Sequence, residues 1–186
     1  KHNEGNKMKI KKGDLISDLT LPSIDGKNFK IQEHKGKKIF LTFYRFAACP
    51  FCNLRINEII KRYDELGKNF LVVAVFDSPL DNLIKHAKKH NAPFPILADE
   101  NYKYYEKYGL ERSFLKFLRA VIFKFPTLIK ASMKGFIPIV FKGYVNTLPS
   151  DIMINSNGIV EDVYYAKTDT GDHLPFSKIK SFSVKD

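Results

Sequence analysis

The sequence predicts a mixed α/β sandwich, because strand-like and helix-like segments alternate along the chain and a β-hairpin closes the pattern. With 186 residues, no internal repeats and no low-complexity linker, the chain has the length of one domain with a sizeable core. Apolar residues make up 44% and charged residues 27%, which excludes a disordered or collagen-like chain. The longest unbroken apolar stretch, Phe70–Phe76, is far shorter than the roughly 20 residues of a membrane-spanning helix.

The first half of the chain predicts a hairpin, a strand, a helix and a second strand. Residues 13–31 show short apolar alternation broken by an Asp-Gly turn dipeptide, which predicts a hairpin. Residues 38–45 have the pattern of a buried strand. Residues 50–66 predict a helix, because apolar residues recur on one face, a proline starts the segment and a glycine comes directly after it. Phe70–Phe76 is a β-rich apolar run typical of a central parallel strand.

The middle of the chain continues this alternation. Residues 78–90 predict a helix with Ser78 as its N-cap, since an aspartate lies three residues later. Residues 93–97 predict a short strand, and a helix carrying three tyrosines comes after it (Tyr102, Tyr105 and Tyr108). The order strand, helix, strand, helix indicates parallel strands joined by crossover helices.

The last part of the chain predicts an antiparallel hairpin and a final helix. Residues 151–155 and 159–166 read as strands, and Ser156-Asn157-Gly158 between them reads as a tight turn. Residues 171–175 lead into a short helix.

Two segments hold nearly all of the net charge of +11. Residues 1–12 carry five lysines against Glu4 (+4), and residues 111–145 carry seven Lys and Arg against Glu111 (+6), so the other 139 residues sum to +1. The body is therefore near neutral, and we expect no nucleic-acid partner. We expect a flexible basic tail at residues 1–12 and a single domain at residues 13–186.

Residues 111–145 form a basic hydrophobic segment that we expect to be a helical insertion. Three basic residues fall on one helical face (Arg112, Lys116 and Arg119) and three apolar residues on another (Leu115, Leu118 and Ile122). Pro126 is expected to end that helix, and Gly135 and Pro138 to break the segment beyond it. We favour an insertion packed over the core with its apolar face buried near the active site, where it could also form a homodimer contact or a lid. A weak contact with a membrane surface is the alternative.

The strongest chemical signal is Cys49-Pro50-Phe51-Cys52, where a buried strand gives way to an amphipathic helix. The free N–H groups and positive dipole end of a helix favour thiolate over thiol, and cysteines in such sites have lowered pKa values. Pro50 suits the first helical turn. Cys52, one turn inside the helix, is near enough to close a small ring. We therefore expect Cys49 to be the attacking nucleophile and Cys52 the resolving thiol.

Three other interpretations of the cysteines are weaker. A zinc site needs four ligands, but the chain has no second cysteine pair and its five histidines have no ligand-like spacing to the motif. Inert core cysteines would seldom fall at this spacing on a strand–helix switch. A structural disulfide that closes a four-residue loop constrains the unfolded chain little. We therefore favour redox chemistry, with no metal and no cofactor.

Five parts of the chain, spread over residues 13–166, share the pattern of one family; they are residues 13–21 with Asp25-Gly26, 36–41, 77–79, 94–100 with Tyr108-Gly109, and 152–160. Together they resemble the peroxiredoxins of the alkyl hydroperoxide reductase/thiol-specific antioxidant (AhpC/TSA) family. The resemblance implies a thioredoxin-like three-layer sandwich: a mixed central sheet with flanking helices, an N-terminal hairpin, and an insertion before the last hairpin. It also implies thiol-based redox activity. The paired cysteines and the insertion are most similar to a divergent peroxiredoxin-like branch.

The chain departs from the family at three groups that bind and polarise peroxide. The family's proline seven residues before the peroxidatic cysteine is Thr42 here, and its Thr or Ser three residues before is Phe46. Its arginine aligns with Pro149, which instead matches the proline that thioredoxins place in cis against their CxxC. The buried aspartate of thioredoxins, six residues before the first cysteine, is Phe43 here. The substrate is therefore either a peroxide or a disulfide.

Further residues are candidates for the surroundings of Cys49. Arg45 is either a cation for the thiolate or peroxide, or a solvated arginine at a strand end. His173 is either a proton shuttle or a residue at a helix entry, and Asp172 is expected to be an N-terminal cap. Phe46 and Phe51 would make the rim apolar.

These observations predict a thiol-dependent oxidoreductase of the peroxiredoxin-like kind. Cys49 attacks a peroxide or disulfide, Cys52 closes an intramolecular disulfide, and a partner such as thioredoxin or glutathione reduces it. The alternatives are a thioredoxin-like protein disulfide reductase without peroxidase activity, and a redox-sensing or membrane-surface binding protein. We expect a cytoplasmic location.

Overall fold

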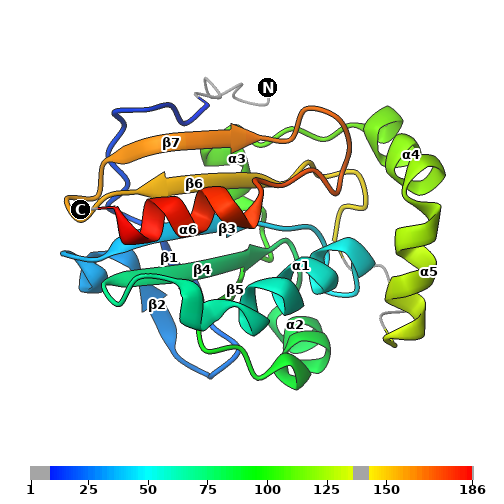
Figure 1. Cartoon of the computed structure of the whole chain (residues 1–186), viewed down its shortest axis with the longest axis horizontal. Helices are drawn as coiled ribbons and strands as arrows, with labels where there is room; N and C mark the ends of the chain where they lie inside the picture. The colour runs from blue at the N-terminus through cyan, green and yellow to red at the C-terminus, as the bar shows by residue number, and fades with distance from the viewer. Residues whose placement is uncertain (1–8, 136–142, 186) are drawn as a thin grey trace.

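A mixed sheet forms the centre of the protein in a computed structural model that describes residues 9–135 and 143–185 (Figure 1). Within those residues the sheet has the order β5-β4-β3-β6-β7. The first three strands are parallel, and β6 and β7 are antiparallel to their neighbours. Their bounds are Ile96–Ala98 (β5), Phe70–Phe76 (β4), Lys38–Phe43 (β3), Ser150–Ile154 (β6) and Val160–Tyr165 (β7). The predicted parallel strands and closing hairpin are confirmed.

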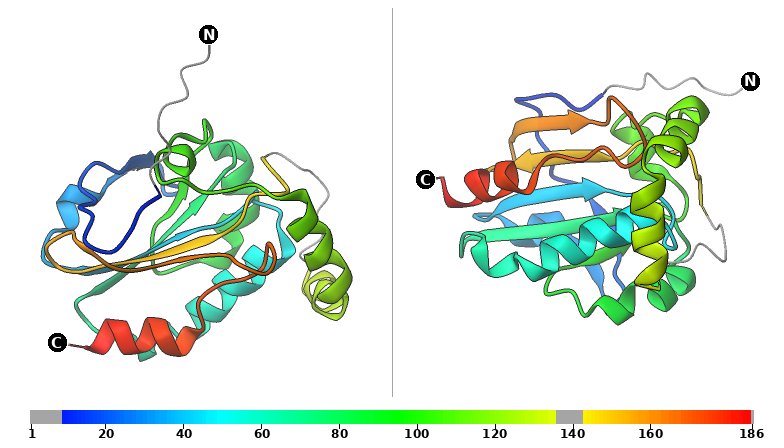
Figure 2. Two further views of the ribbon diagram at one scale, coloured as in Figure 1. Left: turned by 90° about the horizontal axis from the view of Figure 1, so that it is seen from above. Right: turned by 45° about the vertical axis from the view of Figure 1, so that its right-hand side comes forward.

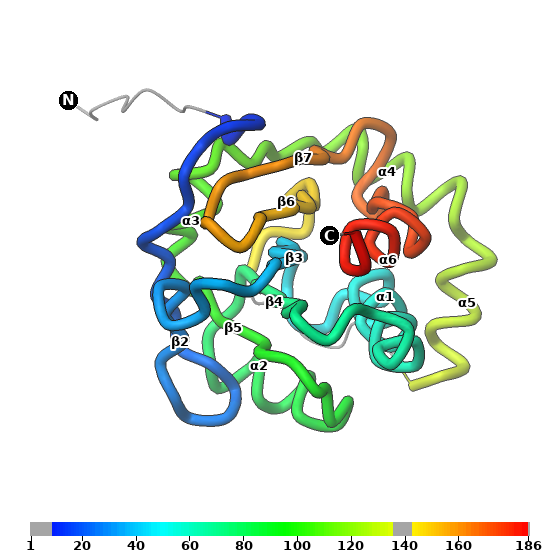
Figure 3. Tube along the Cα trace, turned by 60° about the vertical axis from the view of Figure 1, so that its left-hand side comes forward, coloured from blue at the N-terminus to red at the C-terminus, as the bar shows by residue number. Residues whose placement is uncertain are grey.

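Helices and a small hairpin cover the two faces of this sheet (Figure 3). Alternate strand residues point to opposite faces, so Phe40 and Ile39 enter different core layers. One layer contains the helices α1, α2 and α6 (Pro50–Lys61, Leu80–Ala87 and Phe176–Val184). The other contains α3 and the β1–β2 hairpin (Lys103–Lys107, Thr20–Pro22 and Asn28–Lys30). The predicted three-layer sandwich with a thioredoxin-like fold is confirmed.

The N-terminal hairpin forms around the predicted turn. Leu21 pairs with Phe29 in an antiparallel ladder, and Gly26 adopts a φ of 86°, which favours glycine. Residues 1–8 of the predicted tail lie outside the described residues. Lys9 forms an ion pair with Glu111.

Three helices are shorter than predicted. Helix α3 contains Tyr105, whereas Tyr102 and Tyr108 are its cap residues. Helix α1 ends at Lys61, and a 3₁₀ turn at Tyr63–Glu65 carries the chain on. Helix α2 is shorter than the predicted 78–90, and Ser78 is not its N-cap. Pro79 takes the cap position, and the Ser78 hydroxyl oxygen instead accepts a hydrogen bond from the Ala47 N–H. Ser78 thus serves the loop before Cys49, a contact that local spacing does not predict. A second 3₁₀ turn comes after α2 at Lys88–His90, and another precedes β3 at Ile31–His34.

The described part of the insertion contains two helices, α4 (Phe114–Phe123) and α5 (Phe125–Met133). Ser113 caps α4 by accepting a hydrogen bond from the Lys116 N–H, and Pro126 lies in the first turn of α5. Gly135 comes after α5 with a φ of 79°, whereas Pro138 lies outside the described residues. We call residues 114–135 the helical arm. Figure 2 shows it beyond the end of the sheet at which α1 begins.

The expectation of a buried apolar face on this insertion is wrong at the predicted positions. Leu115, Leu118 and Ile122 are exposed, and the side chains that turn to the body are instead Phe117 and Ala120. Because the alanine side chain is small, α4 approaches the core along that stripe rather than along the larger leucines. Within the described residues, no helix is long and apolar enough to cross a bilayer.

Candidate active site

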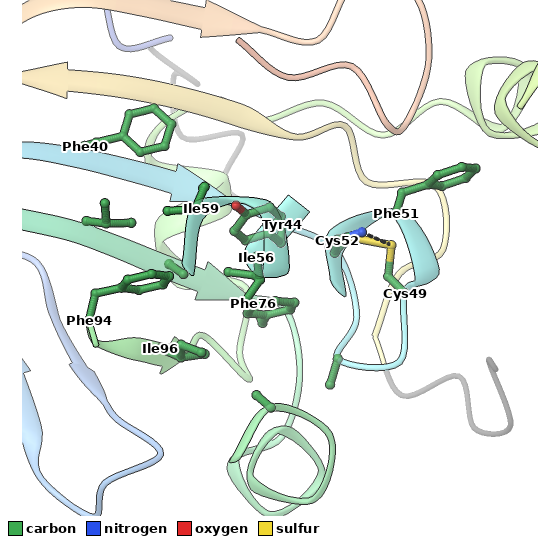
Figure 4. Packing of buried hydrophobic residues seen from close by; sticks show 14 of the residues in the cluster. Phe40, Tyr44, Cys49, Phe51, Cys52, Ile56, Ile59, Phe76, Phe94 and Ile96 are labelled. Atoms are coloured by element: carbon green, nitrogen blue, oxygen red, sulfur yellow. Dashed lines mark hydrogen bonds between the residues drawn. A yellow bond between two sulfur atoms is a disulfide. The ribbon is translucent and has the colours of Figure 1, made fainter. Parts of the chain in front are cut away.

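The two cysteines lie at the start of α1, the helix that follows β3 along the chain. Cys49 is the N-cap of α1, and its Sγ accepts a hydrogen bond from the Cys52 N–H at 3.3 Å. The two residues form a disulfide with Cα atoms 5.3 Å apart (Figure 4). Both side chains are buried. In this oxidised form, Cys49 Sγ marks the place of the thiolate, which would face the positive end of the helix after reduction.

Arg45 reaches the same sulfur from the end of β3. Its Nη2 donates to Cys49 Sγ at 3.0 Å, and its Nη1 donates to the Val145 carbonyl at 2.8 Å. The guanidinium is only 2% exposed, and it lies over three aromatic rings at 5.6, 5.8 and 5.9 Å from their centroids (Phe46, Phe51 and Phe117). Burial lowers the pKa of Arg45 to about 10, so the side chain remains a cation at neutral pH. The structure therefore places a fixed positive charge against Cys49, not a solvated arginine.

Asp77 directly follows β4, the strand beside β3, and its carboxyl group is buried. Its Oδ2 accepts hydrogen bonds from Thr147 Oγ1 at 2.8 Å and from the Tyr144 N–H at 3.3 Å. Burial raises its pKa to about 8, although the hydrogen bonds and the charge of Arg45 act in the opposite direction. The raised pKa favours the protonated carboxyl at neutral pH, and in that form Asp77 offsets less of the positive charge of Arg45.

Asn53 fixes the loop that carries Cys49. Its Nδ2 donates to the carbonyl oxygens of Ala47 and Cys49 at 2.9 and 2.8 Å. Its Oδ1 lies 2.6 Å from His90 Nε2. Because an amide oxygen only accepts, the imidazole donates through that nitrogen. These contacts hold the backbone that leads into the CxxC turn.

A second buried carboxylate, Asp151, lies on β6 directly opposite Thr42. Its oxygens accept hydrogen bonds from Thr42 Oγ1 at 2.6 Å and from the Leu174 N–H at 2.8 Å, and His173 Nδ1 lies at 3.2 Å. Burial alone would raise the pKa of Asp151, but His173 and the other donors outweigh it and lower the pKa below its usual value. His173 is thus held by Asp151 at the active-site end of the sheet.

Comparison with known proteins assigns the family. The profile of the AhpC/TSA family matches residues 12–163. The chain belongs to the AhpC/TSA family. The prediction of a peroxiredoxin-like thiol oxidoreductase is confirmed by this match, and AhpC/TSA membership implies a peroxide substrate and a thiol reductant in general terms.

Relatives and solved structures agree with this AhpC/TSA assignment. Peroxiredoxin Bcp of Escherichia coli is 27% identical over 149 residues, which cover 78% of this chain and 94% of that protein. Chloroplastic peroxiredoxin Q of Triticum aestivum is 28% identical over 105 residues, which cover 55% of this chain and 48% of that one. The crystal structure of peroxidoxin BcpB from Mycobacterium tuberculosis superposes with a TM-score of 0.69 at 16% identity, covering 95% and 99% of the two chains. That superposition shows the shared fold.

The peptide bond before Pro149 differs from the cis bond expected from the match to thioredoxins. Pro149 directly precedes Ser150, which pairs with Phe43, so it lies at the end of the sheet where β3 leads to Cys49. The predicted cis peptide bond is wrong, because this bond is trans. The Leu148 N–H donates to the Glu111 carbonyl, and the Pro149 carbonyl accepts from the Ala166 N–H. These bonds hold the segment in the trans form that X–Pro bonds ordinarily prefer.

The predicted cap at Asp172 is also wrong. Pro175 takes the cap position of α6. Asp172 instead accepts hydrogen bonds from the N–H groups of Lys167 and Thr168 and from the Tyr164 hydroxyl. A short carboxylate satisfies its own loop more readily than a helix that starts beyond a proline.

Three residues of the candidate site were not predicted from the sequence: Asp77, Asp151 and Asn53. Asp77 directly follows the apolar strand β4, and Asp151 is the second residue of β6. A charged residue beside such apolar residues is itself a signal of a buried polar partner. Asn53 comes directly after the CxxC, but nothing in its spacing indicates its contacts. Within residues 9–135 and 143–185, no group of three or more His, Cys, Asp and Glu side chains is arranged to hold a metal ion.

Proposed function

We propose that the protein is a thiol peroxidase in which Cys49 attacks the peroxide and Cys52 resolves the product. The observation that carries the proposal is the pair of donors at Cys49 Sγ, the Arg45 guanidinium and the Cys52 N–H. Both favour a thiolate, and the guanidinium also lies where charge develops when the O–O bond breaks. Arg45 thus takes the part of the three family groups that Thr42, Phe46 and Pro149 do not supply.

The proposed reaction proceeds in two steps. The Cys49 thiolate attacks the distal peroxide oxygen; an S–O bond forms, the O–O bond breaks, and the alkoxide or hydroxide leaves with a proton as alcohol or water. Cys49 is then a sulfenic acid. The Cys52 thiol displaces the hydroxyl group as water and forms the disulfide seen here. Overall, the peroxide is reduced by two electrons and the dithiol is oxidised by two.

Access to Cys49 requires movement around it. The side chain is fully buried, and three rings surround the adjacent guanidinium (Phe46, Phe51 and Phe117). Phe117 belongs to α4, so opening this ring cover involves the helical arm. The apolar cover excludes water from the site, and it strengthens the attraction between Arg45 and the thiolate.

We propose further that residues 13–186 act as one domain and that a partner dithiol or thiol, such as thioredoxin or glutathione, reduces the disulfide. A compartment that supplies such reductants favours a cytoplasmic location. His173 is proposed as a positioning residue rather than a proton shuttle, because its Nδ1 faces Asp151. A protein disulfide reductase remains the second candidate, since the CxxC is already closed as a disulfide at a helix start.

Stopped-flow mixing of the fully reduced protein with hydrogen peroxide tests the proposal. The wild type is expected to react several orders of magnitude faster than an ordinary thiolate and to end as the Cys49–Cys52 disulfide. Cys49→Ser should abolish the reaction, whereas Cys52→Ser should keep the fast step and accumulate a sulfenic acid. A slow rate in the wild type, with rapid reduction of a protein disulfide, would instead establish the reductase.

A further inference from the structure

The helical arm exposes large apolar side chains. Eight of them have 43–84% of their surface accessible (Phe114, Leu115, Leu118, Ile122, Phe123, Phe125, Ile129 and Met133). Scattered single apolar residues are normal on a protein surface, but a set of this size on two consecutive helices marks an interaction surface. The core does not explain these side chains, because the arm packs on the body through other residues, among them Phe117, Ala120 and Leu128.

The charge of the arm has one sign. Residues 114–135 contain five basic residues (Lys116, Arg119, Lys124, Lys130 and Lys134) and no aspartate or glutamate. Two of the five turn to the body, since Lys124 forms an ion pair with Asp169 and Lys116 Nζ donates to the Ala166 carbonyl. The other three, Arg119, Lys130 and Lys134, are exposed beside the apolar side chains. The surface therefore combines apolar area with exposed positive charge.

The arm is attached at the active-site end of the molecule. The chain segments before and after the arm are joined by backbone hydrogen bonds. The Ser113 N–H donates to the Asn146 carbonyl, and the Leu148 N–H donates to the Glu111 carbonyl. Helix α5 packs against α1, and Phe117 of α4 lies against the Arg45 guanidinium. In Figure 2 the arm stands beyond the strand ends, so a flat surface can meet it without meeting the opposite end of the sheet.

We propose that the helical arm docks on the surface of an anionic phospholipid bilayer. A partner of this chemistry fits both features at once: apolar side chains enter the interface between headgroups and acyl chains, and basic side chains pair with lipid phosphates. A second copy of the chain fits less well, because its arm would bring the same positive charge to the contact. Docking would also hold Cys49 near the bilayer. Since Cys49 would then act beside the acyl chains, the substrate class is hydroperoxides of membrane acyl chains; this part of the inference rests on the proposed peroxidase function.

Vesicle co-sedimentation tests the docking without any measurement of activity. The full chain should bind vesicles that contain phosphatidylglycerol and leave phosphatidylcholine vesicles unbound, with binding weakened by salt. Neutralising the exposed bases together (Arg119→Gln, Lys130→Gln and Lys134→Gln) should weaken binding at least roughly tenfold. The double variant Leu115→Ser, Ile122→Ser should also weaken vesicle binding, because it removes two of the exposed apolar side chains.

A matched control removes the same charge elsewhere. Lys35, Lys37 and Lys68 are exposed and lie beside the first residues of β3 and β4, at the opposite end of the sheet. The triple change to Gln should leave vesicle binding nearly intact. Equal loss in this control, or no binding of the wild type to anionic vesicles at low salt, would overturn the proposal. Concentration-dependent dimers that are lost with Leu115→Ser, together with no vesicle binding, would assign the arm to a second copy instead.

An activity measurement then separates the substrate class from the docking. The neutralised arm variant should reduce phospholipid hydroperoxide in anionic vesicles at least several-fold more slowly than the wild type, with an unchanged rate toward hydrogen peroxide. Vesicle binding without peroxidase activity would leave the docking intact and refute the proposed function. Equal rates toward the vesicle substrate in both proteins would refute the substrate class.

Discussion

Arg45 Nη2 donates a hydrogen bond to Cys49 Sγ at 3.0 Å, and the same guanidinium is anchored through Nη1 to the Val145 carbonyl. Two fixed contacts on one planar group leave it little freedom to turn away from the sulfur. The cation comes from four residues upstream on the chain, whereas the family pattern would place an arginine where Pro149 stands. The positive charge thus reaches the Cys49 sulfur from the end of a different strand.

The amide of Asn53 is predicted to hold the CxxC turn in place. Asn53→Ala removes the two buried hydrogen bonds to the carbonyls of Ala47 and Cys49, and it also removes the hydrogen bond from His90 Nε2. We expect a loss of about 2–3 kcal/mol in the free energy of unfolding, measured by urea titration of the oxidised protein. Lys61→Ala, at an exposed position of the same helix, should change it by less than about 0.5 kcal/mol. Equal stability of the two variants would show that the Asn53 contacts contribute nothing.

The raised pKa of Asp77 predicts a stability that falls as pH rises. The folded pKa of about 8 lies above the unfolded value of 3.8, so the folded protein binds this proton more tightly. The contribution is complete below the unfolded pKa and is lost as pH rises through the folded one. Asp77→Asn keeps the acceptor for Thr147 and cannot ionise. Its melting temperature relative to the wild type should therefore increase by at least about 3 °C between about pH 5 and pH 7.

Thermal unfolding across this pH range measures the effect, and Asp64→Asn at an exposed position is the control. A difference between Asp77→Asn and the wild type that stays constant with pH would contradict the prediction.

The contribution of Asp151 to stability should depend on pH with the opposite sign. Its folded pKa is lowered, so its contribution is present above the unfolded pKa and is lost as pH falls through the folded value. In the wild type, the Thr42 hydroxyl and the Leu174 N–H each donate to a different oxygen of Asp151. In Asp151→Asn the amide has only one acceptor oxygen, so one of these two donors loses its partner. We expect a loss of about 1–3 kcal/mol near neutral pH.

The loss for Asp151→Asn should shrink on acidification below the usual aspartate range. Asp162→Asn, at an exposed position of β7, should have little effect at either pH. If Asp151→Asn were as costly in acid as at neutral pH, the role assigned to the ionised carboxylate would be wrong.

The arrangement that the sequence predicts for the candidate site is built from neighbouring residues. Cys49 and Cys52 share a helix start with Pro50, and Arg45 is only four residues away, so local geometry brings them together. The strands are predicted by apolar runs that only a sheet buried on both faces explains.

The parts that the sequence does not predict depend on contacts between distant segments. Thr42 and Asp151 are 109 residues apart, and Asp77 and Thr147 are 70 apart. The first pair forms because β6 lies beside β3, and the second because the chain after the helical arm lies beside the end of β4. The periodicity of the sequence does not predict which segments become neighbours. The apolar side of α4 was misassigned for a related reason: periodicity finds an apolar stripe but does not say whether the protein or another partner covers it.

The most direct test of the role of Arg45 is the pH dependence of the second-order rate of reduced protein with hydrogen peroxide, compared between the wild type, Arg45→Lys and Arg45→Met. If Arg45 activates Cys49, Arg45→Met should lower the rate roughly 100-fold or more and move the midpoint of the rate profile to higher pH. Arg45→Lys should recover part of the rate, because an ammonium keeps the charge but not the paired geometry. Equal rates and equal midpoints in all three proteins would contradict the central role of Arg45.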